Sequence, residues 1–162
     1  MRWLAAAGVP VLLAAGLAAS FGTARVQHAS MSPTLEDGAL VLYDRVLPAA
    51  RGDIVLVDDP GAWSAEPDAV LIKRVVGVAG DRIRCCEAGT GRLLVNGVPV
   101  VEPYAGADRP GGSIRFEITV PDGAVWLMGD NRAESHDSRA DLDTAAHGAV
   151  PRTSLRGVVR LS

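Results

Sequence analysis

An uncharged apolar run near the amino terminus constrains this chain more than any other feature of its sequence. Residues 3–22 read WLAAAGVPVLLAAGLAASFG and contain no charged side chain. About 20 such residues are enough to cross the hydrocarbon layer of a bilayer as a helix, and Pro10 is tolerated there with a kink. We therefore expect residues 1–22 to form one transmembrane helix that anchors the chain.

A cleaved secretory signal peptide is the competing interpretation of the same run. Arg2 would supply the short positive segment, and Ala18, Ala19 and Ser20 are small enough to precede a cleavage site. We favour a retained anchor because the run is long for the apolar part of a signal peptide. Arg2 and Arg25 flank the run almost equally, so charge does not predict its orientation.

The rest of the chain reads as short β-strands separated by turns. Apolar stretches rich in Val, Ile and Leu alternate with turn residues, and the sequence holds 18 Gly and 10 Pro. Asn96-Gly97 is a strong signal for a two-residue hairpin turn. Strands are expected within 39–46, 52–60, 69–83, 92–101, 113–120, 123–131 and 155–162. We expect a mainly β fold with one short helical turn at 141–147 and exposed loops at 63–68 and 105–112.

Composition excludes several kinds of partner. A net charge of -3 and a pI of about 5.6 do not suit a nucleic-acid surface, so no nucleic acid is expected. His136 and His147 lack the spacing of helical zinc ligands, and the adjacent Cys85 and Cys86 make a poor metal site. We expect no metal or other cofactor. The two cysteines form either a disulfide between neighbours or two buried thiols.

The stretch HASMSPTLEDG, residues 28–38, holds two candidate nucleophiles. Ser30 and Ser32 lie on either side of Met31. A serine hydroxyl is a weak nucleophile unless a neighbouring base takes its proton. The identity of that base decides what chemistry the stretch supports.

Lys73 is the only lysine of the chain, and it lies in the apolar stretch VLIKRVVGV. Strand alternation places it on the same face as Leu71 and Val75, where burial would lower its pKa. A pKa of about 8 leaves roughly one lysine in ten uncharged at pH 7. His136, supported by Asp137 or Asp130, is the alternative base, and the residues alone leave both possibilities open.

Three segments, taken in order, resemble the sequence boxes of type I signal peptidases, the membrane-bound Ser–Lys peptidases of the S26 type. Residues 30–35 (SMSPTL) resemble the first box, and residues 73–77 (KRVVG) with 80–81 (GD) resemble the second. Residues 129–139 (GDNRAESHDSR) resemble the third. The similarity covers nearly the whole chain after the apolar run. It implies a signal-peptidase-like antiparallel sheet with a small inserted β-domain.

The resemblance also implies a role for individual residues. Ser30 would be the nucleophile, Lys73 the general base, and Ser135 the hydrogen-bond partner that orients the lysine. Asp137 and Arg139 would form a supporting ion pair in a buried polar network that Arg74 joins. Side chains that would contact substrate are Met31, Leu71 and Ile72. Residues with an implied structural role are Pro33, Gly129, Asp130, Asn131 and Arg132.

One departure from the family pattern concerns the oxyanion hole. Some members carry a serine two residues before the nucleophile, and here that position is His28. The backbone N–H of Ser30 would be the first donor to the oxyanion. His28 is either a second donor or a residue of the lipid interface.

The resemblance predicts a signal peptidase I that cleaves exported preproteins after small residues, through an acyl-enzyme. It implies an anchor at 1–22, a catalytic β-domain of 23–84 and 121–162, and an inserted β-subdomain at 85–120. The protein would be a single-pass, monomeric protein of the cytoplasmic membrane, with the catalytic domain on the outer side. The alternatives are a maturation peptidase with a single client and a non-enzymatic, membrane-anchored β-domain.

Overall fold

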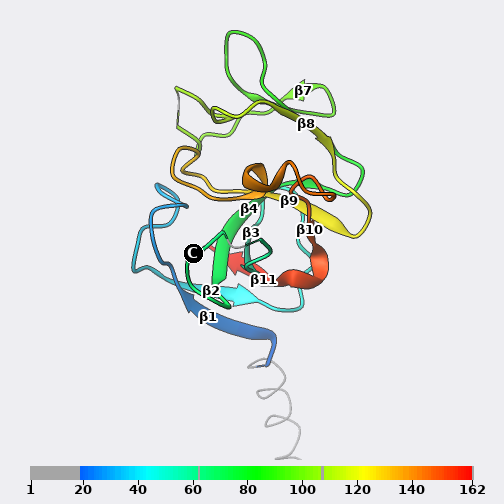
Figure 1. Cartoon of the computed structure of the whole chain (residues 1–162). Helices are drawn as coiled ribbons and strands as arrows, with labels where there is room; N and C mark the ends of the chain where they lie inside the picture. Colours follow the sequence, from blue (N-terminus) through cyan, green and yellow to red (C-terminus); the bar gives the residue numbers. More distant parts are fainter. Residues whose placement is uncertain (1–18, 62, 107, 162) are drawn as a thin grey trace, which may run out of the picture.

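The chain folds into two antiparallel β-sheets, a large one and a small one placed above it (Figure 1). The computed structural model describes residues 19–61, 63–106 and 108–161. The large sheet has the strand order β1-β2-β11-β3-β4-β9-β10, and the small sheet has the order β7-β6-β5-β8. The elements are β1 (Phe21–Arg25), β2 (Leu40–Asp44), β3 (Ile54–Asp58), β4 (Val70–Val78), β5 (Arg82–Cys85), β6 (Leu93–Val95), β7 (Val98–Pro99), β8 (Phe116–Thr119), β9 (Ala124–Met128), η1 (Ser138–Asp141), β10 (Val150–Pro151), η2 (Arg152–Ser154) and β11 (Leu155–Arg160). The expected mainly β fold is confirmed.

Several boundaries differ from those expected. Residues 1–18, most of the expected transmembrane helix, lie outside the described residues, and β1 already begins at Phe21. No helix in the described part of the chain is long and apolar enough to cross a membrane. The small sheet begins at Arg82, ahead of the expected boundary at residue 85. The helical turn η1 ends at Asp141, where the expected turn at 141–147 was to begin.

Strand β3, near the centre of the large sheet, is buried on both of its faces. Ile54 and Leu56 of β3 pack in one cluster with Met31, whereas Val55 and Val57 pack in another on the opposite face. Because neighbouring residues of a strand point to opposite faces, both faces must be apolar here. This explains why β3 reads as a continuous apolar run.

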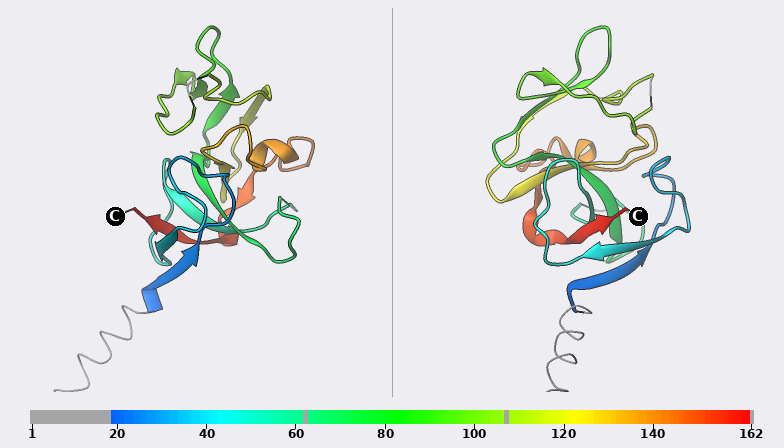
Figure 2. Two further views of the ribbon diagram at one scale, coloured as in Figure 1. Left: turned by 90° about the vertical axis from the view of Figure 1, so that its left-hand side faces the viewer. Right: turned by 180° about the vertical axis from the view of Figure 1, so that it is seen from behind.

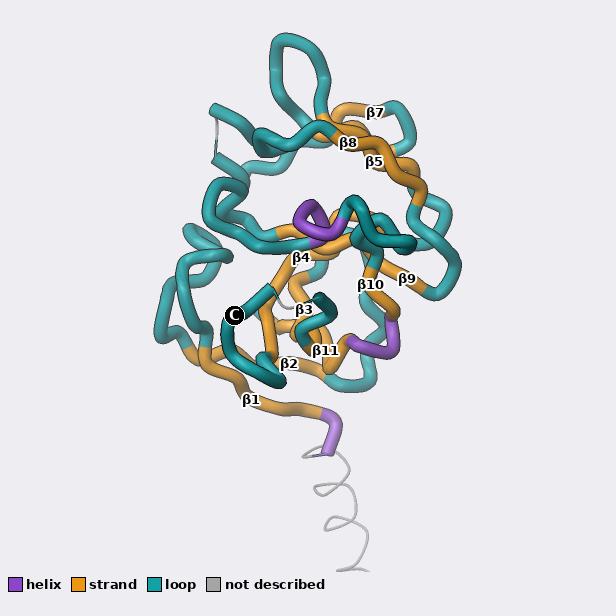
Figure 3. Tube along the Cα trace, in the orientation of Figure 1, coloured by secondary structure: helices purple, strands orange, loops and turns teal. Residues whose placement is uncertain are grey.

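The small sheet packs against one face of β9, and two further views show β1 at the end of the molecule farthest from the small sheet (Figure 2). Phe116 of β8 contacts Trp126 of β9, with ring centroids 5.2 Å apart. The predicted hairpin joins β6 to β7, and both Asn96 and Gly97 have positive φ, as this turn requires. Helix η1 lies beside β9, on the side of the small sheet (Figure 3).

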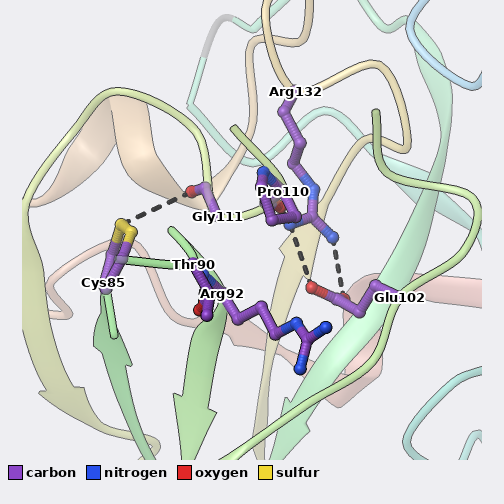
Figure 4. Close-up of a disulfide and its surroundings, with 8 residues drawn as sticks. Cys85, Thr90, Arg92, Glu102, Pro110, Gly111 and Arg132 are labelled. Atoms are coloured by element: carbon purple, nitrogen blue, oxygen red, sulfur yellow. Dashed lines mark hydrogen bonds and ion pairs between the residues drawn. A yellow bond between two sulfur atoms is a disulfide. The ribbon is translucent and has the colours of Figure 1, made fainter. Parts of the chain in front are cut away.

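Cys85 and Cys86 form a disulfide, which settles the question that the sequence left open. Figure 4 shows the disulfide next to Gly111, whose carbonyl oxygen lies 3.6 Å from the Cys85 sulfur. A Cβ at Gly111 would lie 2.6 Å from the Cys86 sulfur, so only glycine fits against the disulfide.

Candidate active site

Ser30 lies in a tight turn between β1 and β2. The N–H of Leu35 donates to the carbonyl of Met31 at 3.0 Å, so Pro33 lies within a single closed turn. The Ser30 carbonyl accepts a hydrogen bond of 3.1 Å from the N–H of Asn131. This bond ties the serine turn to the segment that follows β9. The hydroxyl and the N–H of Ser30 have no hydrogen-bond partner among the described residues.

Lys73 lies in the middle of β4 and is buried, as strand alternation predicted. Lys73 is only 3% exposed to solvent. Burial disfavours the charged ammonium and lowers the pKa of Lys73 to about 8. Asp137 acts in the opposite direction, and the positive charge of Arg139 partly offsets it. An amine with this pKa supplies an appreciable neutral fraction at pH 7.

Ser135 lies next to the Lys73 amine and near the turn that holds Ser30. The Lys73 Nζ donates a hydrogen bond of 3.1 Å to the Ser135 hydroxyl. Gly129 allows this approach, because a Cβ there would lie 2.3 Å from the Ser135 Oγ and 2.5 Å from the Ser30 carbonyl oxygen. Any side chain at position 129 would therefore displace either the lysine's partner or the serine turn.

Asp137 and Arg139 form a closed ion pair behind Ser135. Two guanidinium nitrogens of Arg139 donate to the two Asp137 carboxylate oxygens, each at 2.8 Å, and both side chains are buried. The N–H of Gly129 adds a third bond at 3.0 Å. Burial opposes ionisation, but these donors hold the pKa of Asp137 below its usual range. The carboxylate is thus occupied by partners other than the lysine.

Arg74 pairs with Asp130 and shares no hydrogen bond or ion pair with Asp137 or Arg139 in the described part of the chain. The two side chains form two hydrogen bonds, of 2.8 and 2.6 Å. Asp130 also accepts a bond of 2.5 Å from the Thr34 hydroxyl. Neighbouring residues of β4 point to opposite faces, so Arg74 cannot reach the side where Lys73 lies. Asp130 therefore connects the serine turn to β4.

A second buried ion pair joins this framework to the inserted segment. Arg132 pairs with Glu102 at 2.8 Å and also donates to the Pro110 carbonyl (Figure 4). Glu102 accepts a bond from the Tyr104 hydroxyl, and the Tyr104 ring lies 3.8 Å from the Arg74 guanidinium. These contacts are those of framework residues.

Ser30 and Lys73 line one pocket of about 380 Å³. Its apolar wall includes Leu71 and Ile72, which the resemblance placed at the substrate. Polar residues that also line it are Arg25, Gln27, His28, Ser64, Glu66, Glu134 and His136. His136 and Ser30 share no hydrogen bond in the described part of the chain. The pocket thus brings together the Ser30 hydroxyl, the Lys73 amine with its lowered pKa, and the apolar edge of β4.

Two residues differ from their expected positions. Met31 is 1% exposed and packs in the core with Leu35 and Ile72, so it does not line the pocket as expected. Trp63 was assigned to an exposed loop but is 7% exposed and lines the pocket. The size and apolarity of its ring were the signal for burial, although its turn-rich neighbours pointed the other way.

Replacing His28 with alanine is expected to change the turnover number by less than about threefold. The N–H of His28 donates to Asp37, but no hydrogen bond fixes its ring among the described residues. An oxyanion donor must be held in place, and losing one typically costs about 10²–10³ in rate. Steady-state kinetics on a cleavable substrate measures the effect. A loss of 10²-fold or more would make His28 a donor.

A serine and a buried lysine that line one pocket form the candidate centre of a serine–lysine hydrolase. The family described as signal peptidase, peptidase S26, matches residues 1–162. The chain belongs to this family.

Individual relatives agree with the family assignment. The chain is 33% identical over 166 residues to a signal peptidase I of Bacillus licheniformis, covering 94% of this chain and 85% of the relative. It is 31% identical over 181 residues to a signal peptidase I of Mycobacterium tuberculosis. That match covers 82% of this chain but spans only 61% of the mycobacterial relative's length.

A solved structure has the same fold. The crystal structure of a signal peptidase I from Enterococcus faecalis V583 superposes with a TM-score of 0.54 at 25% identity. The superposition covers 71% of this chain and 99% of the enterococcal chain. The two antiparallel sheets are therefore the architecture of this family.

Proposed function

We propose that this protein is a membrane-anchored signal peptidase I that hydrolyses exported preproteins with a Ser30–Lys73 dyad. The observation that carries the proposal is the burial of Lys73 beside Ser30 in one pocket, with a pKa of about 8. A buried amine whose hydrogen-bond partner among the described residues is a hydroxyl, not a carboxylate, is suited to accept a proton near neutral pH. Family membership and the similarity to named signal peptidases support the same reaction.

The reaction follows from the proton inventory of the site. The neutral Nζ of Lys73 takes the Ser30 proton as the Oγ attacks the scissile carbonyl, and the Ser30 N–H donates to the oxyanion. The lysine then protonates the leaving amine, which departs as the mature amino terminus. A water molecule, deprotonated by the same lysine, hydrolyses the ester. Catalytic hydrogen bonds of free enzymes are often long and shorten once substrate is bound.

The supporting residues act through the lysine. Ser135 receives the Nζ hydrogen bond and so fixes its direction. Asp137 raises the pKa of Lys73, and the positive charge of Arg139, which is paired with Asp137, offsets part of this effect. Arg139 thus helps to keep the pKa of Lys73 low, although neither charge of the ion pair takes part in the chemistry.

The edge of β4 next to the pocket suits an extended peptide. Strand β9 pairs with β4 only from Arg74 to Val78, which leaves the preceding residues open on that side. The N–H of Val75 donates to the carbonyl of Asp53, the residue just before β3. Along an antiparallel strand, the main-chain groups of successive residues point alternately to the two sides of the strand. The main-chain groups of Val70 and Ile72 therefore point toward the open edge. A preprotein segment would add there as a strand, with small side chains preceding the cut.

The location proposed for the enzyme follows from its substrate. Signal peptides emerge on the outer side of the cytoplasmic membrane, and Ser30 lies only a few residues after the apolar run 3–22. A retained anchor would hold the site at that surface as a single-pass protein with its catalytic domain outside. Exported preproteins and the lipid bilayer would then be its partners.

Incubating the full chain in detergent with a secretory preprotein tests the proposal. We expect one cut after an Ala-x-Ala sequence, and amino-terminal sequencing of the shortened product identifies the bond. Preproteins that stay intact, while a known signal peptidase cleaves them under the same conditions, would contradict the proposal.

A further inference from the structure

Trp63 is a pocket residue for which the dyad mechanism has no use. It lies in the loop between β3 and β4 and lines the pocket together with Ser30, Leu71 and Lys73. Its ring packs in the cluster that holds Val57 and Leu71, on the same face of β4 as the lysine. A large rigid side chain at this place must restrict what else enters the pocket.

The structure holds Trp63 at both of its ends. Its backbone N–H donates to the Asp59 carboxylate at 2.8 Å, and its indole Nε1 donates to the Asp141 carboxylate at 2.6 Å. A Cβ at Gly61 would lie 2.3 Å from that Asp141 oxygen and 3.2 Å from the indole nitrogen. Glycine at position 61 therefore permits the bond between the loop and η1.

These bonds determine what the ring can offer to a substrate. The indole N–H is its only polar group, and Asp141 occupies it. What remains toward the pocket is apolar surface of fixed position. Such a surface gives no proton and no charge to the reaction, but it limits volume.

We propose that Trp63 is a specificity residue that sets the upper size of one substrate side chain entering the pocket beside Ser30. This inference rests on the proposed function. The substrate is the segment that precedes the cut, because the open part of β4 ends at Lys73 and runs back past Leu71. Asp141 acts as a positioning residue, since it holds the ring and does not line the pocket.

The test is a substrate series in which each of the four residues before the cut is changed singly to leucine. For wild type and Trp63→Ala, the ratio of kcat/KM for each leucine substrate to kcat/KM for the parent is measured. We expect Trp63→Ala to raise this ratio about 10–100-fold at one position and to leave the other three within about threefold. A ratio cancels any general loss of activity or of folded enzyme, so a merely structural role for Trp63 would not change it.

Three further variants make the result specific. Trp63→Phe keeps most of the bulk and should preserve the wild-type ratios, whereas Asp141→Ala frees the ring and should raise the ratio at the same position by a smaller factor. Pro67→Ala, an exposed change in the same loop outside the pocket, is the matched control. Trp63→Leu replaces Trp63→Ala should the latter fail to fold.

Two results would overturn the inference in distinguishable ways. Normal wild-type cleavage of the parent with ratios that Trp63→Ala leaves unchanged at all four positions would overturn the role of Trp63 alone. Absence of wild-type cleavage of any substrate would overturn the proposed function and this inference together.

Discussion

Replacing Ser30 with alanine is expected to reduce preprotein cleavage by a factor on the order of 10⁴ or more. The change removes the proposed attacking oxygen, and losses of this size are typical for a catalytic serine. The Ser30 hydroxyl has no hydrogen-bond partner among the described residues, so the free energy of unfolding should change by less than about 0.5 kcal/mol. Cleavage rates and thermal unfolding of the same preparation measure both quantities.

Ser32 provides the matched control two residues away. Its hydroxyl donates to Glu36 at 3.2 Å in an exposed position, and it does not line the pocket with Lys73. Ser32→Ala should therefore keep the cleavage rate within about twofold. An inactive Ser32→Ala variant together with an active Ser30→Ala variant would show that Ser32, and not Ser30, is the nucleophile.

Much of the fold could be predicted from local sequence because its strands are short and the central ones, such as β3, are buried on both faces. The apolar stretch that contains β3 and the Asn96-Gly97 turn each specify their structure within a few residues. The burial of Lys73 was also predictable, since alternation alone places it among apolar neighbours. Local rules are sufficient where the environment is set by residues adjacent in sequence.

Other features depend on contacts between distant segments and could not be predicted in this way. Arg74 pairs with Asp130 and not with Asp137. Asp130 follows β9, so this partner can be identified only once the pairing of β4 with β9 is known. Strand β1 lies where the apolar run ends, and composition does not distinguish a membrane residue from a strand residue there. Trp63 is buried by Asp141, a partner 78 residues away in the chain. Long-range partners, not propensities, made these choices.

The same framework explains why the site is stable although it contains several buried charges. Arg74, Arg132 and Arg139 are each paired with one carboxylate at 2.6–2.8 Å. Breaking a buried pair typically costs about 3–5 kcal/mol because one charge remains uncompensated. Lys73 differs from these three, since no carboxylate among the described residues is hydrogen-bonded to its buried amine. Burying the Lys73 amine is therefore expected to lower the free energy of unfolding at neutral pH.

Preprotein cleavage is expected to depend steeply on pH through the protonation of Lys73. Only the neutral amine accepts the serine proton, so kcat/KM should rise about tenfold per pH unit below the pKa and level off above it. With the pKa of Lys73 lowered to about 8, the half-maximal value is expected near pH 8. A profile half-maximal near pH 6.5, and lost in His136→Ala, would instead identify a histidine base.

The same pKa shift fixes the sign of a stability effect. Unfolded, the lysine has a pKa near 10.5; folded, its pKa is about 8, so between these values the unfolded state binds the additional proton. Stability is therefore undiminished above about pH 10.5 and falls as the pH decreases toward 8. Below that it stays lower by about 3 kcal/mol.

Lys73→Met should accordingly abolish cleavage and yet make the protein more stable at pH 7. Methionine fills a similar volume without a charge to bury, and the expected gain in the free energy of unfolding is roughly 2 kcal/mol after the loss of the Ser135 hydrogen bond. The gain should shrink as the pH rises toward 10.5, because the wild-type lysine then becomes neutral in both states. Urea unfolding of both proteins at pH 7 and pH 10 measures the difference. A destabilised Lys73→Met at pH 7, or a gain that does not change with pH, would mean that Lys73 is not held as a desolvated amine, and the dyad would lose its base.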